Sequence, residues 1–166
     1  MLHSLLSRAH RHGLVSSAEA HCDIPCKIYD TAPITVAALT VVRMIDVLED
    51  WRKHRPEDDV AFMNTVARAV AQKEEHAAYV KDAVVVIWGD YFKAPQIEKY
   101  PQIHGLVHDI MLKGSAVKQG VNRDDAVKLV ELVNEFAEIF WATKGVKTKR
   151  AVCPYPPSLE VVYVDL

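Results

Sequence analysis

Apolar residues recur at helical spacing in four long stretches of this chain, and proline, glycine or charged turns separate the stretches. In residues 31–51, Val41, Met44 and Leu48 follow the three-and-four spacing that predicts an amphipathic helix. A second helix is expected over residues 56–88, with a proline in its first turn and acidic residues directly behind it. Its expected buried face consists of Val60, Met63, Ala67 and Val70.

Two further helices are expected in the second half of the chain. The third is predicted over residues 101–114, and the segment before it, residues 91–100, contains a proline and predicts a loop. The fourth helix runs from its cap at Asn122 to a stop at Gly145. The expected apolar faces consist of Ile103, Val107, Ile110 and Met111 in the third helix and of Val130, Val133, Phe136 and Phe140 in the fourth.

Four helices with short connections predict an all-α fold, an antiparallel four-helix bundle over residues 31–145. The length of 166 residues suits one compact domain. Residues 146–166 predict an extended C-terminal tail, in which residues 159–164 have strand character and Cys153 stands alone. This tail could add an edge strand, wrap around a neighbouring copy or stay mobile.

Composition excludes two kinds of partner. With a net charge of -2, the chain lacks the basic excess that marks a nucleic-acid-binding surface. The longest apolar run, residues 83–88, is far shorter than the roughly 20 residues that cross a membrane. Three cysteines are an odd, low number that argues against a disulfide framework. We therefore expect no nucleic acid and no membrane as a partner.

Residues 1–20 differ from the rest and predict a leader that is removed. They carry Arg8 and Arg11, and residues 18–20 read Ala-Glu-Ala, the small-x-small pattern of a cleavage site. The apolar run of a secretory signal is missing, and an amphipathic leader with arginine and serine also suits an organelle transit peptide. The cytoplasm is the expected location, with organelle targeting and export left open. The alternative is a plain N-terminal arm.

Residues 21–30 read His-Cys-Asp-Ile-Pro-Cys-Lys-Ile-Tyr-Asp and offer the donors of a metal site. If His21 became the first residue, its free amine would join the amide nitrogen of Cys22. The thiolates of Cys22 and Cys26 would complete a plane of two nitrogens and two sulfurs, which suits Ni(II) or Cu(II), and the imidazole of His21 could bind as an axial fifth ligand. Pro25 favours a compact turn that brings the two thiols together. A local disulfide and two inert thiols remain the alternatives.

Residues 21–30 also resemble the nickel-binding hook of nickel superoxide dismutases. Two further segments match that family in order and spacing. Residues 88–101 contain Trp-Gly-Asp-Tyr-Phe-Lys-Ala-Pro followed by Glu-Lys-Tyr-Pro, and residues 139–144 read Ile-Phe-Trp-Ala-Thr-Lys. The chain is therefore similar to this family from His21 to about Lys144.

This resemblance implies an enzyme that disproportionates superoxide to dioxygen and hydrogen peroxide while one nickel ion per chain cycles between Ni(II) and Ni(III). It also implies a homohexamer of four-helix bundles and a protease that removes the leader. The nickel ligands would be His21, Cys22 and Cys26. The residues implied around the metal are Asp23 and Tyr29, which organise the pocket, Tyr91 and Lys93 beside the entrance for small anions, and Arg68, a partner of the axial histidine.

Two positions depart from the family pattern. Lys27 follows the second cysteine, where the family usually has glycine, and Ala37 takes the place of a glutamate that supports the axial histidine. Such partners orient the ligands and tune the metal. The alternative function is therefore a nickel- or copper-binding homologue for storage or sensing, without dismutase activity. A weaker alternative is an oligomeric structural protein with a disulfide between Cys22 and Cys26.

A second metal site is a minor possibility in the third helix. His104 and His108 are four residues apart on one helix face, a spacing that can bind a metal ion. A carboxylate pattern that would strengthen this site is missing nearby, and partly exposed helix histidines without metal are more common.

Overall fold

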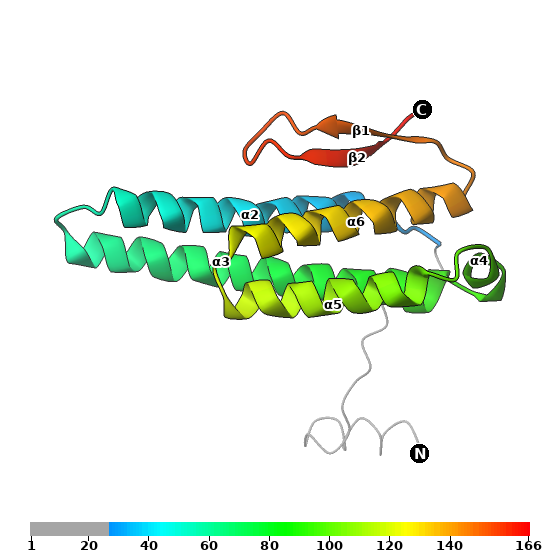
Figure 1. Ribbon diagram of the computed structural model, residues 1–166, viewed down its shortest axis with the longest axis horizontal. Helices are drawn as coiled ribbons and strands as arrows, with labels where there is room; N and C mark the ends of the chain where they lie inside the picture. Colours follow the sequence, from blue (N-terminus) through cyan, green and yellow to red (C-terminus); the bar gives the residue numbers. More distant parts are fainter. Residues whose placement is uncertain (1–26) are drawn as a thin grey trace, which may run out of the picture.

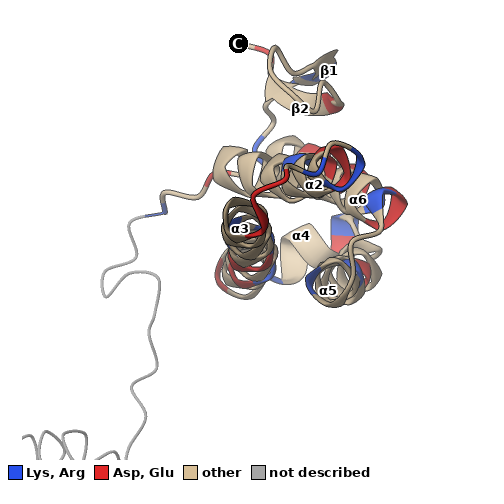
Figure 2. Ribbon diagram, turned by 90° about the vertical axis from the view of Figure 1, so that its left-hand side faces the viewer, with Lys and Arg blue, Asp and Glu red and all other residues tan. Residues whose placement is uncertain are grey.

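Four helices form an antiparallel bundle, as the sequence predicts (Figure 1). The structure, a computed structural model, describes residues 27–166, so the leader and residues 21–26 of the hook lie outside it. Viewed end-on, the helices surround one core, in which α2 and α5 each pack on both α3 and α6 (Figure 2). No helix in the described part of the chain is both long and apolar enough to cross a bilayer. The four helices are α2 (Ala32–Lys53), α3 (Asp59–Val86), α5 (Ile103–Gln119) and α6 (Arg123–Thr143).

Local side chains set several helix ends. Asp58 accepts hydrogen bonds from two backbone N–H groups in the first turn of α3, at 2.9 and 3.1 Å. Asn122 caps α6 in the same way, as predicted. Gly145 follows the end of α6 with a φ of 72°, in the left-handed region that glycine adopts without a steric penalty. The predicted ends of α6 are thus confirmed, whereas α3 begins after Pro56 rather than at it.

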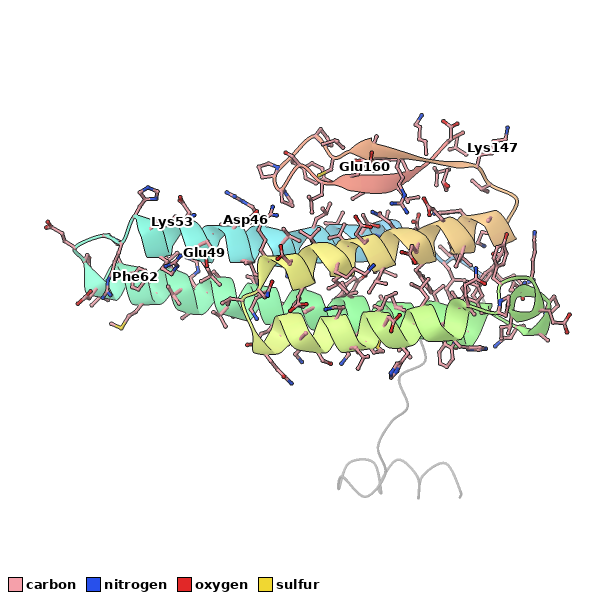
Figure 3. All side chains as sticks on the ribbon, viewed as in Figure 1. Asp46, Glu49, Lys53, Phe62, Lys147 and Glu160 are labelled. Carbon is pink, nitrogen blue, oxygen red and sulfur yellow. The ribbon has the colours of Figure 1, made fainter. Side chains whose placement is uncertain are left out.

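The buried face of α3 differs from the prediction. Val60 and Met63 are 72% and 59% exposed, and Ala67 is exposed as well. The reason is that α2 and α3 project together beyond the shorter α5 and α6 (Figure 1). Phe62 lies in this projecting part, where its ring stacks on that of Trp51 at 6.5 Å (Figure 3). The buried side chains of α3 are those of Ala69, Lys73, Ala77, Val80 and Val84.

The third bundle helix, α5, continues past Gly114, where the sequence predicts its end. Gly114 lies inside the helix because the side chain of Lys81 from α3 crosses it, so a Cβ there would lie 2.8 Å from Lys81 Cγ. The Lys81 ammonium then donates to Ser115 Oγ at 2.9 Å. This glycine therefore marks the close approach of two helices rather than a helix end.

Lys73 joins α3 to the end of α5. Its side chain is 2% exposed, and its ammonium donates to the carbonyl oxygens of Val117, Lys118 (2.8 Å) and Gly120 (2.9 Å). The last carbonyls of a helix have no partner within that helix, so a lysine from a neighbouring helix satisfies them here. Burial lowers the pKa of Lys73, and the nearby charge of Glu74 opposes that shift.

A π-helical turn and a short helix replace the loop predicted for residues 91–100. The turn η1 (Ile87–Tyr91) continues α3, and the helix α4 (Ala94–Lys99) follows it. Lys93 is the N-cap residue of α4, and the neighbouring Phe92 is buried in the core. Because a π turn is wider than an α turn, it alters the direction of the side chains at the end of a helix.

The C-terminal tail forms a hairpin of two antiparallel strands, β1 (Thr148–Val152) and β2 (Glu160–Val164), that lies against α6 (Figure 1). Asn134 of α6 is 1% exposed and holds the hairpin with both ends of its amide. Its Nδ2 donates to the Glu160 carbonyl at 2.9 Å, and its Oδ1 accepts from the Val162 N–H at 3.1 Å. The predicted strand at residues 159–164 is confirmed, whereas β1 was not predicted.

Candidate metal centre

The tyrosine of the hook, Tyr29, lies at the end of the bundle where η1 turns into α4. Its ring centroid is 5.9 Å from that of Tyr91 in η1, with the two planes at 54°. Tyr91 in turn packs edge-on against Phe140 of α6 at 5.0 Å. Three segments that lie far apart in the sequence, namely the hook, residues 88–101 and residues 139–144, therefore meet at one place.

The hydroxyl of Tyr91 has a defined direction. Its oxygen lies 2.6 Å from Thr143 Oγ1, which lies 2.6 Å from the carbonyl oxygen of Phe140. A carbonyl can only accept, so Thr143 donates its single hydroxyl hydrogen there and must accept from Tyr91. The ring of Tyr91 is thus held in one orientation beside Tyr29. Its hydroxyl hydrogen is already donated to Thr143.

The stretch between the hook and α2 is held at two points. Trp141 donates its indole N–H to Thr31 Oγ1 at 3.0 Å, and Thr31 is only 3% exposed. Asp30 Oδ1 accepts from the backbone N–H of Ala32 at 2.8 Å. The end of α6 and the first turn of α2 together fix the direction in which the hook extends from the bundle.

Lys144 brings a positive charge beside Tyr91. Lys144 Nζ lies 4.6 Å from the centroid of the Tyr91 ring, within cation–π range. Lys93 is exposed, and its Nζ donates to the carbonyl oxygen of Gly89 at 2.9 Å. Sequence reasoning treated Lys144 as part of a matching segment and a helix stop, and gave it no role at the site. The sequence did contain a signal for Lys144, because this residue lies directly after Thr143 in the third segment that matches the family.

Lys27 has a φ of 58°, in the left-handed region of the backbone. This conformation costs a residue with a side chain about 1–2 kcal/mol, whereas glycine adopts it freely. The glycine that the resemblance leads us to expect at this position would therefore adopt this conformation without strain. Lysine keeps the same backbone direction and adds a positive charge next to Cys26.

The residues expected to support the axial histidine are not gathered at Tyr29 and Tyr91. Ala37 is 3% exposed in α2 and lines a groove between α2 and α3. Arg68 is exposed in α3 beside Met44 of α2, closer to the projecting ends of the two helices. The other predicted site residues lie outside the described residues: His21, Cys22, Asp23 and Cys26.

His104 is already engaged in a way that disfavours a metal site with His108. Trp88 Nε1 donates to His104 Nδ1 at 3.1 Å, so the neutral ring carries its hydrogen on Nε2. In this tautomer neither ring nitrogen of His104 has a lone pair left for a metal ion. Within residues 27–166, no cluster of three or more His, Cys, Asp or Glu side chains could hold an ion.

Comparisons with known proteins identify the family. The family model of nickel-containing superoxide dismutase matches residues 16–144. The superoxide dismutase (Ni) of Streptomyces coelicolor is 36% identical over 128 residues, which are 77% of this chain and 91% of that protein. The corresponding protein of Streptomyces seoulensis is 34% identical over 125 residues, 75% of this chain and 88% of that protein.

A solved structure agrees with these sequence matches. The native structure of nickel superoxide dismutase superposes with a TM-score of 0.64 at 34% identity, covering 75% of this chain and 99% of that chain. The family match ends at residue 144, directly after α6, so the hairpin β1–β2 lies beyond it. The chain belongs to the nickel-containing superoxide dismutase family.

Proposed function

We propose that this chain disproportionates superoxide: two superoxide anions and two protons give dioxygen and hydrogen peroxide, with one nickel ion bound per chain. The observation that carries the proposal is the contact between Tyr29 and Tyr91. This contact supports the proposal, because Tyr91, with the ammonium of Lys144 over its ring, lies beside the tyrosine of the hook. Membership of the family supports nickel as the metal.

The hook fits nickel by its donor types. After removal of the leader, His21 offers an amine and an imidazole, Cys22 an amide nitrogen and a thiolate, and Cys26 a second thiolate. Nitrogen and soft sulfur donors suit this metal. Bound nickel supplies a one-electron couple between Ni(II) and Ni(III). Asp23, between the two cysteines, supplies a carboxylate acceptor that organises the hook.

Side chains around the hook select and attract the substrate. Tyr29 would lie beside the bound metal and limit access to it, and the ring contact with Tyr91 would fix the orientation of Tyr29. Lys93 and Lys144 raise the local concentration of a small anion and its rate of arrival. Arg68 is the arginine that the family resemblance pairs with the imidazole of His21, but it is not among the residues that line the groove beside Ala37. The hydrogen of the Tyr91 hydroxyl is engaged by Thr143, so protons reach the substrate from other groups or from water.

The active form is proposed to be a homohexamer of chains from which a protease has removed residues 1–20. The projecting ends of α2 and α3 expose Val60 and Met63, which is apolar surface of the kind that contacts between copies cover. Without cleavage before His21, the amine ligand does not exist.

Two forms of the chain test this function, one beginning at His21 and one retaining Met1, each reconstituted with nickel. We expect bound nickel and fast superoxide decay in the His21 form, and neither in the Met1 form. The assay is nickel per chain by elemental analysis together with superoxide decay after pulse radiolysis. A His21 form carrying Cys26→Ser controls for nickel bound elsewhere.

The second candidate function is nickel or copper binding for storage or sensing. Ala37 and Lys27 favour it, because both differ from the family pattern. A His21 form that binds nickel tightly but leaves the decay of superoxide at background would support this function and overturn the dismutase proposal.

A further inference from the structure

A groove of about 510 Å³ separates the first turns of α2 from the middle of α3. We propose that this α2–α3 groove binds residues 21–26 of the chain itself, and that Glu75 is the positioning residue there, accepting a hydrogen bond from His21. This inference rests on the proposed function, because it concerns how the nickel-loaded hook is held. The residues of the groove that carry the argument are Pro33, Val36 and Ala37 from α2 and Glu75, His76 and Tyr79 from α3.

The groove lies within reach of the hook. The described chain begins at Lys27, only a few residues before Ala32, which also lines the groove. An extended chain covers about 3.3–3.6 Å per residue, so residues 21–26 can span roughly 20 Å.

The walls of the groove are apolar and open to solvent. Val36 is 51% exposed and Tyr79 is 46% exposed, although both belong to helices of the bundle. The hook carries Ile24 and Pro25 between its two cysteines. Each Å² of apolar surface that both sides remove from water contributes about 25 cal/mol, so these two side chains favour binding in the groove.

The polar groups of the groove lie on α3 and suit a donor with positive charge. Glu75 is exposed, and its Oε2 accepts from Gln72 Nε2 at 2.9 Å, which directs the carboxylate along the helix surface. His76 Nδ1 lies 2.8 Å from the carbonyl oxygen of Gln72. Since a carbonyl only accepts, Nδ1 carries the hydrogen, and Nε2 of the neutral ring holds a lone pair. The groove thus offers two acceptors side by side.

His21 is the matching donor. When one imidazole nitrogen of a histidine binds a metal, the other usually donates its N–H to a carboxylate, a carbonyl or water, which fixes the ring and raises its basicity. Across the groove from Glu75, the side chain of Ala37 is only a methyl group, so that wall provides no acceptor and leaves room for an imidazole. Glu75 is therefore the carboxylate that the groove presents to the hook.

The first test replaces Glu75 by glutamine in the chain that begins at His21. We expect Glu75→Gln to weaken nickel binding by about 10- to 100-fold in competition with a chelator, as for other partners of metal-bound histidine. The matched control is Glu74→Gln, which removes the same charge one residue away and outside the groove. Thermal unfolding of both metal-free variants verifies that they fold.

The second test moves the carboxylate to the opposite wall. The double variant Ala37→Glu with Glu75→Gln is expected to regain nickel affinity to within about 10-fold of the unsubstituted chain, since the acceptor returns to the same groove. In the oxidised samples, electron paramagnetic resonance is expected to show an altered splitting by the axial nitrogen in Glu75→Gln. This splitting is expected to return toward the original value in the double variant.

A third measurement tests whether the groove becomes covered, and it does not depend on enzyme activity. Diethyl pyrocarbonate modifies accessible imidazoles, and peptide mass spectrometry follows each histidine. We expect nickel binding to slow the modification of His76 and to leave that of His54, which is exposed at the far end of α2, unchanged.

The outcomes separate this inference from the proposed function. An unsubstituted chain that binds no nickel overturns both. If that chain binds nickel and removes superoxide, yet Glu75→Gln behaves like Glu74→Gln and His76 stays accessible, only the groove proposal fails. Loss of affinity in Glu75→Gln alone, with rescue by Ala37→Glu, supports it.

Discussion

At the scale of single residues, the cluster around Tyr91 shows what the sequence could reveal about the site and what it could not. Tyr29 and Tyr91 were predicted because each lies within a segment that matches the family. Lys144 was not, because its contact with the Tyr91 ring depends on where α6 ends relative to η1. No local pattern encodes the distance between two helix ends that are about 50 residues apart, so this part of the site required the folded structure.

Lys144 provides a prediction about substrate attraction. Lys144→Gln is expected to lower kcat/KM for superoxide by roughly 2- to 10-fold at low ionic strength, because one positive charge beside Tyr91 disappears. The difference should shrink as salt is added, since exposed charges are screened beyond about 10 Å at 0.1 M. Pulse radiolysis across a salt series measures it. Lys144→Arg is the control and should keep most of the rate; equal rates for Lys144→Gln and the unsubstituted chain at low salt would contradict the role.

At the scale of elements, the ends of α6 and the buried faces of α5 and α6 followed from the sequence pattern, whereas the buried face of α3 and the end of α5 did not. Asn122 and Gly145 defined α6 because a cap and a left-handed glycine act within one turn. The buried face of α3 was predicted wrongly, since Val60 and Met63 become exposed only because α5 is too short to cover them. The direction in which the hook leaves the bundle could not be predicted either, because it depends on a hydrogen bond between Trp141 and Thr31, which lie far apart in the sequence.

The contact between Lys73 and the end of α5 predicts a dependence of stability on pH. Burial lowers the pKa of Lys73 in the folded chain, whereas the unfolded lysine titrates at its ordinary value of 10.5. Between these two pKa values the unfolded chain binds more protons, so the free energy of unfolding rises with pH there. At lower pH both forms of Lys73 are protonated and this contribution is constant.

We therefore expect the free energy of unfolding of the unsubstituted chain, minus that of Lys73→Met, to increase as the pH approaches 10.5 from below. Urea unfolding at a series of alkaline pH values measures this difference. Lys128→Met, at an exposed position of α6, is the control and should show no such increase. A difference that falls with pH would show that the pKa of Lys73 is raised instead.

Asn134 gives a prediction about the attachment of the hairpin. Asn134→Leu removes both hydrogen bonds to β2 and leaves the Glu160 carbonyl and the Val162 N–H without this partner. We expect a loss of about 1–3 kcal/mol in the free energy of unfolding, because two part-buried hydrogen bonds, each worth about 0.5–1.5 kcal/mol, disappear. Urea unfolding measures it, with Glu135→Gln at the exposed neighbouring position as control. A loss no larger than that of the control would mean that the amide contributes little.

At the scale of the whole molecule, the hairpin is an addition to a bundle that is complete without it. The solved nickel superoxide dismutase is covered over 99% of its length by 75% of this chain, and the family match ends before β1. Inside the hairpin, Cys153 and Val161 are buried, and Arg150 forms an ion pair with Glu138 of α6 at 2.7 Å. These contacts stabilise the outer side of α6 without touching Tyr29 or Tyr91.

A chain that ends at Val146 is therefore expected to keep its helices and its nickel, and to unfold at a lower temperature. Losing about 2–4 kcal/mol corresponds to a fall in Tm of roughly 5–15 °C for a domain of this size. Circular dichroism during heating and nickel analysis of the shortened chain measure the two properties. Loss of nickel together with full helicity would contradict the separation between hairpin and site.

The meeting of three distant segments at Tyr91 also fixes an order of events during biosynthesis. A chain that is still emerging from the ribosome has made Tyr29 and Tyr91 but not yet Thr143, whose oxygen directs the Tyr91 hydroxyl. The surroundings of the hook exist only after the last helix has docked. We therefore expect tight nickel binding to follow folding, and an unfinished or misfolded chain to bind nickel poorly. Such a dependence would restrict activity to correctly folded molecules.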